Sequence, residues 1–515
     1  MAAPSIPDPK SSDTPLMECR NPATGEVIGT VPVDSRKVVR GKVARARKAT
    51  TLWQQLSFSQ RRNELLRWRR EMAERIDEFA DLIHRENGKP ILDAVGEVLL
   101  ALNHLDHAAK HAAKALAPEK VGSGILANFR SKISYHPMGV VGVIGPWNYP
   151  IYTPIGAMAY ALAGGNACVF KPSELTSLVG MLIEETAHAS LSIPDIVIVT
   201  TGGGETGAAL AKAGVDKISF TGSTATGKKV MKAAAENLTP VVLELGGKDP
   251  MIVTDDADVE AAADAAVFGA MTNAGQTCIA IERCYVHENV YDRFLDRVVD
   301  GVQQLDVGAD GDAKIGAMTS REQVDIVRDH IEDAVAKGAK VVTGGPERIR
   351  ESFVEPTVLV DVTDDMKIMK DETFGPVLPI MRVSSVDEAV SKANSLPYGL
   401  GSTVFAGKNA QSIADRIKAG MTAINSALSF AAVPNLPFGG VGESGLGRLH
   451  GDQGFREFTR IQAVTEQRFA LPINLFSFRT PDNMTDHLRK MAHELYGGGV
   501  VDKATSLWSS LWGGK

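Results

Sequence analysis

Apolar and polar positions follow two periodicities along this chain. Between about Ser35 and Leu116 the apolar residues recur at the three- and four-residue spacing of amphipathic helices. The clearest stripe is Ile76, Phe79, Ala80 and Ile83, after which Gly88 and Pro90 act as stop signals. The pattern predicts a series of helices here, preceded by a hairpin around Asn21–Gly25.

From Val140 onward, short β-branched runs are separated by helical stretches. The first runs are Val140–Ile144, Ala167–Phe170, Ile196–Val199, Lys217–Phe220 and Val241–Leu243. Strands that alternate with helices are typical of βαβ units on a parallel sheet. The sequence therefore predicts an α/β fold.

A second α/β stretch follows residue 244. Its strands are expected at Met251–Val253, Cys284–His287, Lys340–Thr343 and Val377–Val383, and the Ala- and Val-rich helix near Asp258–Thr272 is expected to be buried on most faces. Beyond about Phe469 a polar helix is predicted near Asp486–Leu495, followed by a segment with Trp508 and Trp512. Two exposed tryptophans could touch a membrane or a subunit interface, although a packed or frayed helix is the simpler interpretation.

Composition narrows the range of protein classes. A length of 515 residues predicts two or three domains. The net charge is −7 and no basic stripe dominates, which argues against a nucleic-acid partner. The basic run Arg61–Arg70 contains leucines and a tryptophan at helical spacing, so it is interpreted as a solvated helix face.

The four cysteines are too few for a disulfide framework and none has the CxxC spacing of a metal site. No metal is therefore expected, and a reducing compartment fits. The first residues lack a cationic-then-apolar leader, and no stretch reaches the ~18 unbroken apolar residues that cross a bilayer. These features predict a cytoplasmic protein with no transmembrane segment.

Cys278 is the cysteine best placed for chemistry. It ends the segment Asn273–Cys278, where Gly275 interrupts a long helical run. A thiol at such a break can reach a cleft and meet backbone N–H groups, which favour the thiolate. A buried structural cysteine is the simpler alternative, and the only interpretation for Cys168, which lies inside an apolar strand.

Glu244 ends an apolar strand and is followed by Gly246 and Gly247. A carboxylate there needs a partner or a raised pKa, and a pKa raised toward neutrality suits a general base. The alternative is a buried ion pair, for which Lys248 is the nearest candidate. The glycines favour the functional interpretation because they let a ligand approach the backbone.

Asn148 follows the first sheet strand, in the segment Gly145–Pro150. The carboxyl ends of parallel strands are where ligand sites of α/β proteins gather. An amide N–H₂ there could donate to a developing oxyanion. A turn-forming asparagine between prolines is the alternative.

Two further strand ends suit a dinucleotide. Lys171 and Glu174 follow the second strand, and a carboxylate there suits the hydroxyls of an adenosine ribose while repelling a 2′-phosphate. Gly222 and Ser223 follow the fourth strand and open a helix whose free N–H groups could receive a pyrophosphate. The spacing is not the GxGxxG fingerprint, so this signal is weak by itself.

Taken together and in order, these segments resemble the aldehyde dehydrogenase superfamily from about Asn21 to Gln467. The motifs are PWNYP around Asn148, FKPSE at Lys171–Glu174, FTGS at Phe220–Ser223, LELGGK around Glu244, GQTC ending at Cys278, ETFGP at Glu372–Pro376, and PFGG at Pro437–Gly440. The 34 residues between Glu244 and Cys278 are also the usual interval of that family.

The resemblance implies two Rossmann-type α/β domains and a small β oligomerisation element. Residues 1–243 would form the NAD-binding domain, interrupted by a hairpin near 120–137, and residues 244–430 the catalytic domain. Residues 431–470 would return to the first domain and add an oligomerisation strand, and residues 471–515 would form a C-terminal extension of open role. A homodimer or homotetramer is expected.

The resemblance also implies roles for individual residues. Cys278 would attack the aldehyde, Asn148 and the Cys278 N–H would hold the oxyanion, and Glu244 would activate water to release the acid. Lys171 and Glu174 would bind the adenosine ribose, Glu372 the nicotinamide ribose, and Gly222 and Ser223 the pyrophosphate, with Trp147 and Phe374 beside the cofactor. NAD is preferred to NADP because of Glu174, although some relatives with this carboxylate use both.

The substrate is less well defined by the sequence. The residues expected along the channel are Tyr149, Ile151, Tyr152, Thr153, Gly156, Thr277 and Ile279, which are apolar or neutral. They predict an apolar aliphatic or aromatic aldehyde, with Gly156 leaving room. Succinate semialdehyde is the second candidate, because Arg283 offers a cation near Cys278.

Three competing functions are weighed against this one. They are an acylating enzyme of the same family, a cofactor-free thiol hydrolase and a non-catalytic binding protein. An acylating relative commonly lacks the glutamate, a thiol hydrolase would need a histidine beside the cysteine, and a binding protein should have lost a reacting group. The presence of Glu244, Cys278 and Asn148 in one chain therefore favours oxidation of the aldehyde to the free acid.

Overall fold

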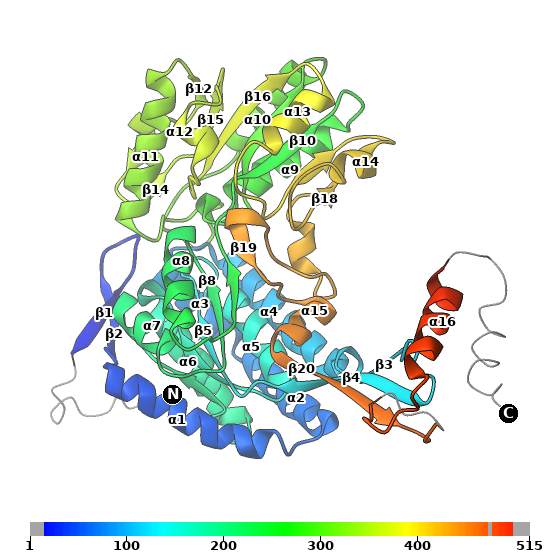
Figure 1. Ribbon diagram of the computed structural model, residues 1–515. Helices are drawn as coiled ribbons and strands as arrows, with labels where there is room; N and C mark the ends of the chain where they lie inside the picture. The colour runs from blue at the N-terminus through cyan, green and yellow to red at the C-terminus, as the bar shows by residue number, and fades with distance from the viewer. Residues whose placement is uncertain (1–14, 472–475, 498–515) are drawn as a thin grey trace. The chain divides into compact units, whose positions relative to one another are not determined.

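The computed structural model of the protein describes residues 15–471 and 476–497 (Figure 1). Trp508, Trp512 and part of the segment Leu471–Phe478 lie outside the described residues. The chain divides into two compact units, one of Met1–Ala117 with Tyr135–Arg460 and one of Pro118–Ser134 with Ile461–Lys515.

The amino-terminal part of the larger unit is helical after one hairpin, as predicted. Strands β1 (Leu16–Arg20) and β2 (Val27–Pro32) pair antiparallel, and the helices are α1 (Arg36–Trp53), α2 (Phe58–Glu74), α3 (Ile76–Asn87) and α4 (Ile91–Ala115). Local chemistry sets their ends: Ser57 forms a capping box with Gln60 at the start of α2. Gly88 ends α3 in the left-handed conformation, with φ 89°.

The first sheet has six strands in the order β19-β9-β8-β5-β6-β7, and all neighbours are parallel except β19 with β9. The strands are β5 (Val140–Ile144), β6 (Ala167–Lys171), β7 (Val197–Val199), β8 (Lys217–Thr221), β9 (Val241–Glu244) and β19 (Gly445–Leu446). The connecting helices are α5 (Tyr152–Ala163), α6 (Ser177–Ser190), α7 (Gly204–Ala211) and α8 (Thr224–Ala235), with the 3₁₀ turn η2 (Glu174–Thr176) before α6.

Strand order reverses direction in this sheet between β5 and β8. The chain runs outward through β6 and β7, then returns to the other side of β5 with β8 and β9. In an open parallel sheet the crevice outside the carboxyl ends of the strands at such a reversal is where ligands bind. The topology therefore marks the ends of β5 and β8 as the place for a site.

The second sheet has seven strands in the order β12-β15-β16-β11-β10-β17-β18, parallel except for β12 with β15. The strands are β10 (Asp249–Val253), β11 (Ile281–His287), β12 (Lys340–Thr343), β15 (Thr357–Val360), β16 (Val377–Val383), β17 (Thr403–Phe405) and β18 (Ala423–Ile424). The helices are α9 (Val259–Met271), α10 (Tyr291–Gln303), α11 (Arg321–Ala336), α12 (Lys367–Lys370), α13 (Val386–Ala393) and α14 (Ala410–Ala414).

Each sheet lies in a hydrophobic core of its own. Helix α9 is buried along most of its length, as predicted, and exposes Phe268 on its remaining face. Short elements complete the larger unit: η3 (Thr272–Gly275), η4 (Pro346–Arg348), β13 (Ile349–Arg350), β14 (Phe353–Val354), η5 (Ser429–Ala432), η6 (Gly442–Ser444) and α15 (Gly451–Glu457).

The smaller unit is built on a three-stranded sheet in the order β20-β4-β3. Its strands are β3 (Glu119–Val121), β4 (Phe129–Pro137) and β20 (Thr459–Gln467). The predicted polar helix is present as α16 (Met484–Tyr496). Strand β20 is an edge strand with mostly exposed side chains.

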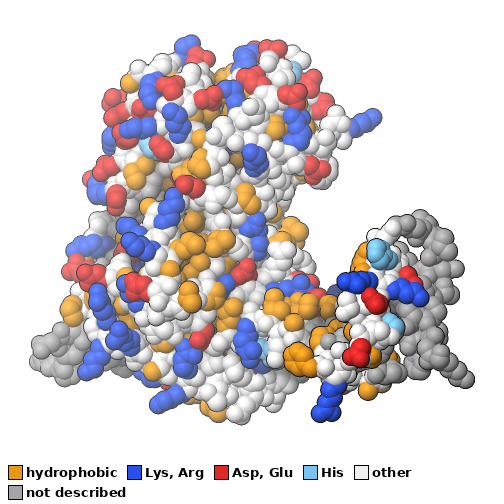
Figure 2. All heavy atoms as spheres, viewed as in Figure 1, with side chains coloured by type: hydrophobic (Ala, Val, Ile, Leu, Met, Phe, Trp, Pro, Cys, Tyr) orange, Lys and Arg blue, Asp and Glu red, His pale blue; other side chains and the backbone are white. Residues whose placement is uncertain are grey.

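On the face shown in Figure 2, acidic and basic side chains are interspersed. Among the described residues no helix combines the length and apolar character that a bilayer crossing requires.

Candidate active site

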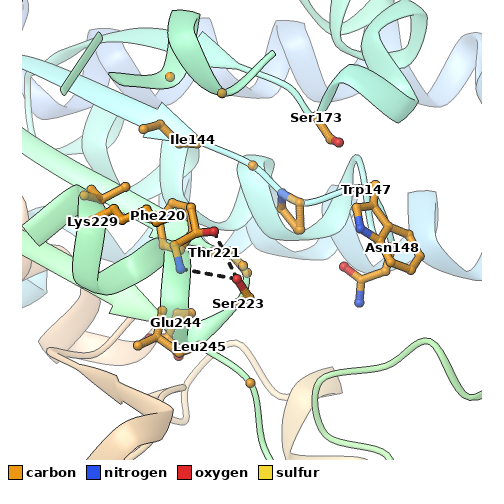
Figure 3. Close-up of a pocket in the computed structure, with 18 of the residues that line it drawn as sticks. Ile144, Trp147, Asn148, Ser173, Phe220, Thr221, Ser223, Lys229, Glu244 and Leu245 are labelled. Atoms are coloured by element: carbon orange, nitrogen blue, oxygen red, sulfur yellow. Dashed lines mark hydrogen bonds between the residues drawn. The ribbon is translucent and has the colours of Figure 1, made fainter. Parts of the chain in front are cut away.

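A cavity of about 710 Å³ opens where the strands of the first sheet end (Figure 3). All ten residues to which the sequence assigns a role line this cavity: Trp147, Asn148, Lys171, Glu174, Gly222, Ser223, Glu244, Cys278, Glu372 and Phe374. They come from strand ends and loops spread over more than two hundred residues. The structure therefore brings together the residues to which the motifs assign a catalytic or cofactor-binding role.

The strand directions explain this convergence. Asn148 follows β5, Lys171 ends β6, Gly222 follows β8 and Glu244 ends β9. These four strands are parallel neighbours, so their carboxyl ends meet at one edge of the sheet. Figure 3 shows Asn148 with Trp147 on one side of the cavity and Glu244 with Leu245 on another.

Cys278 reaches the cavity because the backbone before it is bent sharply. After α9 the residues Asn273 and Ala274 take the left-handed conformation with φ 53° and 54°, and Gly275 has φ 71°. A Cβ on Gly275 would lie 2.1 Å from the carbonyl oxygen of Gly375, so only glycine fits there. Non-glycine residues with positive φ cost free energy and concentrate at functional sites.

The four cysteines differ in exposure. Cys19, Cys168 and Cys284 are buried, whereas Cys278 is half-buried and lines the cavity. The alternative of a buried structural cysteine therefore does not hold for Cys278. Burial, together with the charges of Glu372, Asp249 and Glu244, raises the pKa of its thiol above the ordinary value.

Glu244 is a buried carboxyl group without a partner. Neither carboxylate oxygen forms a hydrogen bond with the described residues. Burial raises its pKa well above the ordinary value, and the opposing effect of the Arg448 charge is smaller. The alternative ion pair is wrong, because the Lys248 ammonium pairs with Glu282 at 2.5 Å.

Asn148 is held by hydrogen bonds on both its side chain and its backbone. Its amide nitrogen donates to the carbonyl oxygen of Gln276, 2.9 Å away, in the segment that leads to Cys278. An amide N–H₂ has two protons. This bond uses one of them, which leaves the second able to donate to a ligand.

The other end of the cavity carries paired charges. Lys171 Nζ lies 3.0 Å from Glu174 Oε2. Burial alone would raise the pKa of Glu174, but the Lys171 charge and hydrogen bonds outweigh it, so this pKa lies below its ordinary value. Ser223 caps α8, accepting from the Thr226 N–H at 3.3 Å (Figure 3). The start of α8 therefore lies at the cavity wall, where a pyrophosphate could meet its first N–H groups.

Glu372 lies against the glycine segment that follows Glu244. Its Oε1 accepts from the Gly247 N–H at 3.1 Å, and a Cβ on Gly246 would lie 2.2 Å from its Oε2. Burial and the nearby Glu282 raise the pKa of Glu372 to about 8. Phe374, with φ 52°, meets the Trp147 ring edge to face at 5.4 Å. Charged, small and aromatic groups thus follow one another along the cavity, which fits an extended dinucleotide.

Sequence reasoning missed the small-residue wall of the cavity. Helices α7 and α8 contribute Gly204, Gly207, Ala208, Ala211, Thr226, Lys229, Val230 and Ala233. The small residues of α7 recur at helical spacing, a signal that was present in the sequence. A slot between small aliphatic residues suits a flat aromatic ring such as adenine.

The residues expected along the substrate channel are mostly engaged with one another. The Tyr149 hydroxyl lies 3.0 Å from Thr277 Oγ1, and the Tyr152 hydroxyl donates to the Ala431 carbonyl at 2.8 Å. The space expected at Gly156 is filled, because a Cβ there would lie 2.8 Å from His450 Nε2. That expectation was wrong: sequence spacing does not show that a distant histidine packs against this glycine.

Arg283 is 2% exposed, and its guanidinium forms hydrogen bonds inside the protein. Its guanidinium donates to the carbonyl oxygens of Lys248, Lys392 and Ala393, at 2.9, 3.1 and 3.0 Å. It holds β11 to the ends of neighbouring segments. Arg283, the cation that made succinate semialdehyde the second candidate substrate, therefore has a structural role.

Comparison with known proteins agrees with this geometry. Residues 9–464 match the model of the aldehyde dehydrogenase family. The chain belongs to the aldehyde dehydrogenase family. It is an NAD(P)-dependent oxidoreductase.

Individual relatives cover most of this aldehyde dehydrogenase. A Methylomonas protein named 4,4'-diapolycopene aldehyde oxidase is 38% identical over 88% of this chain and 86% of its own. A Mycobacterium ulcerans protein named putative succinate-semialdehyde dehydrogenase [NADP(+)] 2 is 37% identical over 86% and 87%. The solved NAD-dependent aldehyde dehydrogenase of Sinorhizobium meliloti has a TM-score of 0.85 and 35% identity, covering 90% of this chain and 93% of that one.

Proposed function

We propose that this enzyme oxidises an apolar aliphatic or aromatic aldehyde to the carboxylic acid with NAD. The observation that carries the proposal is that Cys278, Glu244 and Asn148 line one cavity although they come from three different segments. A nucleophile, a base and an amide donor around one space are what acyl chemistry on an aldehyde needs.

The chemistry divides among these three groups. Cys278 releases its thiol proton to solvent and its Sγ attacks the aldehyde carbon as the thiolate, while the Asn148 amide and the Cys278 N–H donate to the oxyanion of the tetrahedral adduct. A nicotinamide bound in the cavity would supply the acceptor for the hydride of this carbon. The resulting thioester on Cys278 is then attacked by a water molecule whose proton passes to Glu244. The acid leaves and the thiol is restored.

The environment of Glu244 suits this role. Its two oxygens have no partner among the described residues, so the carboxylate is free to accept a proton from water. Burial raises the pKa of Glu244, and a higher pKa increases the driving force for that proton transfer. The acylating branch of the family commonly lacks this glutamate, so hydrolysis is the preferred fate of the thioester.

The nucleotide would be held by the groups at the other end of the cavity. Lys171 and Glu174 would bind the adenosine ribose, the start of α8 with Gly222 and Ser223 the pyrophosphate, and Glu372 the nicotinamide ribose. The ionised Glu174 would repel a 2′-phosphate, which favours NAD. One relative is named for NADP, so both cofactors belong in the assay.

An apolar substrate is supported by the groups near Cys278. The hydroxyls of Tyr149 and Tyr152 are already hydrogen-bonded, and Arg283 is committed to backbone carbonyls. Burying a substrate carboxylate without a cation would be costly. Succinate semialdehyde remains the second candidate because a relative carries that name.

The remaining assignments follow the family. We assign residues 1–243 to the NAD-binding domain, except for the hairpin near 120–137, which belongs to the oligomerisation element. Residues 244–430 form the catalytic domain, and residues 431–470 return to the NAD-binding domain and add the oligomerisation strand.

Edge strand β20 is suited to pairing with a second chain, which supports a homodimer or homotetramer. Four cysteines without a disulfide suit the reducing cytoplasm.

The test is production of NADH on addition of aldehyde. We expect hexanal or benzaldehyde to give kcat/KM at least equal to that of succinate semialdehyde, with NAD better than NADP. A tenfold advantage for succinate semialdehyde would overturn the apolar assignment, and a clear preference for NADP would overturn the cofactor assignment. Absence of NADH with every aldehyde would favour a binding protein.

A further inference from the structure

An ion pair with no solvent exposure lies beside the cavity, in the segment that opens α4. Lys89 Nζ and Glu97 Oε2 are 2.5 Å apart, and both side chains are 0% exposed. Helix α4 packs along α5, which follows the Asn148 segment (Figure 1). Desolvating two charges offsets most of their attraction, so a buried pair is weak support for stability. The function of the Lys89–Glu97 pair is therefore inferred from the other hydrogen bonds that the two side chains form.

Both members of the pair bind the segment that carries Asn148. Lys89 Nζ donates to the Asn148 carbonyl at 3.0 Å and lies 3.9 Å from the centre of the Tyr149 ring. Glu97 Oε1 accepts from the N–H groups of Ile151 and Tyr152, at 2.8 and 3.1 Å. The ion pair thus clamps the loop between β5 and α5 at the asparagine and at the residues after it.

The first turn of α4 also contacts the segment of the nucleophile. Asp93 stands midway along the chain between Lys89 and Glu97, and its Oδ2 accepts from the Asn273 N–H at 3.2 Å. The Asn273 amide in turn donates to the Asn148 carbonyl at 3.1 Å and to the Gln276 carbonyl at 3.2 Å. The first turn of α4 is therefore linked by hydrogen bonds to the segment of Asn148 and to the segment that leads to Cys278.

We propose that Lys89 and Glu97 are positioning residues that fix the Asn148 amide relative to Cys278. The inference rests on the proposed function, in which Asn148 donates to the oxyanion. Oxyanion donors act because they are already in place when charge develops, and small displacements reduce their effect. Lys89 and Asn273 both hold the Asn148 carbonyl, and Lys89 is the donor that the ion pair orients.

The test is the double variant Lys89→Met/Glu97→Gln, which removes both charges together. The amide oxygen introduced by Glu97→Gln can still accept from the Ile151 and Tyr152 N–H groups. The double variant therefore keeps that part of the clamp and removes the Lys89 contacts with the Asn148 carbonyl and the Tyr149 ring. We expect kcat to fall about tenfold, less than the loss of an entire oxyanion donor, with NAD affinity by fluorescence titration unchanged.

A cycle with Asn148→Ala distinguishes positioning from structure. If the pair acts through Asn148, adding Lys89→Met/Glu97→Gln to Asn148→Ala lowers kcat by less than about twofold. Equal losses in both backgrounds, or a kcat of the double variant equal to that of the wild type, would overturn the proposal. Should the double variant fail to fold, Glu97→Gln alone is run through the same cycle with the same criteria.

The chain offers a matched control pair in Lys42 and Asp34. Lys42 Nζ lies 2.5 Å from Asp34 Oδ2 and donates to the Val199 carbonyl at 2.8 Å. Lys42→Met/Asp34→Asn should keep kcat within about twofold, since these bonds do not reach the Asn148 or Cys278 segments. If the wild type itself makes no NADH, the proposed function fails. The positioning inference fails when the wild type is active and Asn148→Ala is impaired but the two changes are independent, or when the double variant keeps the wild-type kcat.

Discussion

Two carboxyl groups of the same cavity, Glu244 and Glu174, have opposite electrostatic surroundings. Glu244 ends β9, is buried and has no hydrogen-bond partner among the described residues, so its pKa is raised. Glu174 follows β6, is exposed and pairs with Lys171, so its pKa is lowered despite partial burial. The comparison shows that the carboxyl group proposed as the base has no internal partner among the described residues, whereas the one proposed to bind the adenosine ribose is paired with a cation.

This difference matches the role proposed for each of the two carboxyl groups. A group that accepts a proton during turnover is more effective if no internal partner competes for it and its pKa is near the working pH. A group that recognises a ribose is more effective if it stays charged and fixed. The comparison predicts large losses of rate at the reactive end and changes of cofactor selectivity at the nucleotide end.

The largest effect is expected at the nucleophile. Cys278→Ser should lower aldehyde oxidation by about 10⁴-fold or more, since a serine hydroxyl is a far poorer nucleophile than a thiol. The measurement is steady-state NADH formation, with circular dichroism to verify the fold. An activity equal to that of the wild type would remove the basis of the whole mechanism.

The base is expected to affect a later step. Glu244→Gln should lower kcat about 10³-fold while leaving a first turnover of NADH, because the thioester still forms but is hydrolysed slowly. In the wild type kcat should rise with pH through the raised pKa of Glu244, and this rise should be absent in the variant. Stopped-flow bursts and a pH profile test both expectations. Loss of the burst would place Glu244 before hydride transfer instead.

The amide donor is expected to have a smaller effect. Asn148→Ala should lower kcat about 10²-fold, the usual loss for one oxyanion donor, with little change in the affinity for NAD. Asn148→Asp is the matched variant: its negative charge should be at least as harmful although its size is conserved. If cofactor affinity fell instead of kcat, Asn148 would belong to the nucleotide end.

At the nucleotide end the effect should be one of selectivity. Glu174→Ser should shift the ratio of kcat/KM for NAD over NADP by about tenfold toward NADP, because a repelling charge is removed while Lys171 stays available. The saturating rate with NAD should change little. A fall in kcat comparable to that of Asn148→Ala would contradict the division between the two ends.

The smallest effect concerns stability. The folded pKa of Glu244 lies above its unfolded value of about 4.3, so its contribution to stability is full below that value and is lost as the pH rises through the folded pKa. Glu244→Gln should therefore melt about 2–4 °C higher than the wild type at pH 8, with the difference vanishing near pH 4. Calorimetry at both pH values tests this, and a less stable variant at pH 8 would mean that Glu244 has a stabilising partner.

Much of the fold was predictable because its signals are local. Helical spacing predicted α3 and the glycine that ends it, and β-branched runs predicted β5, β6, β8 and β9 to within a residue or two. The motifs likewise contained ten of the side chains that line the cavity, and four of these lie at or just after the ends of parallel strands of the first sheet. The α7 and α8 wall was missed because small residues carry no chemical signal of their own.

What the sequence by itself determined is the kind of element along much of the chain, and it predicted roles for Cys278, Glu244 and Asn148. Only the tertiary structure decided that Glu244 lacks a partner among the described residues, that Lys248 pairs with Glu282 and that Arg283 is used internally. It also decided that Lys89 and Glu97 hold the Asn148 loop. The physical reason is that periodicity is set by neighbours along the chain, whereas pairing, burial and pKa depend on groups that folding brings from far away.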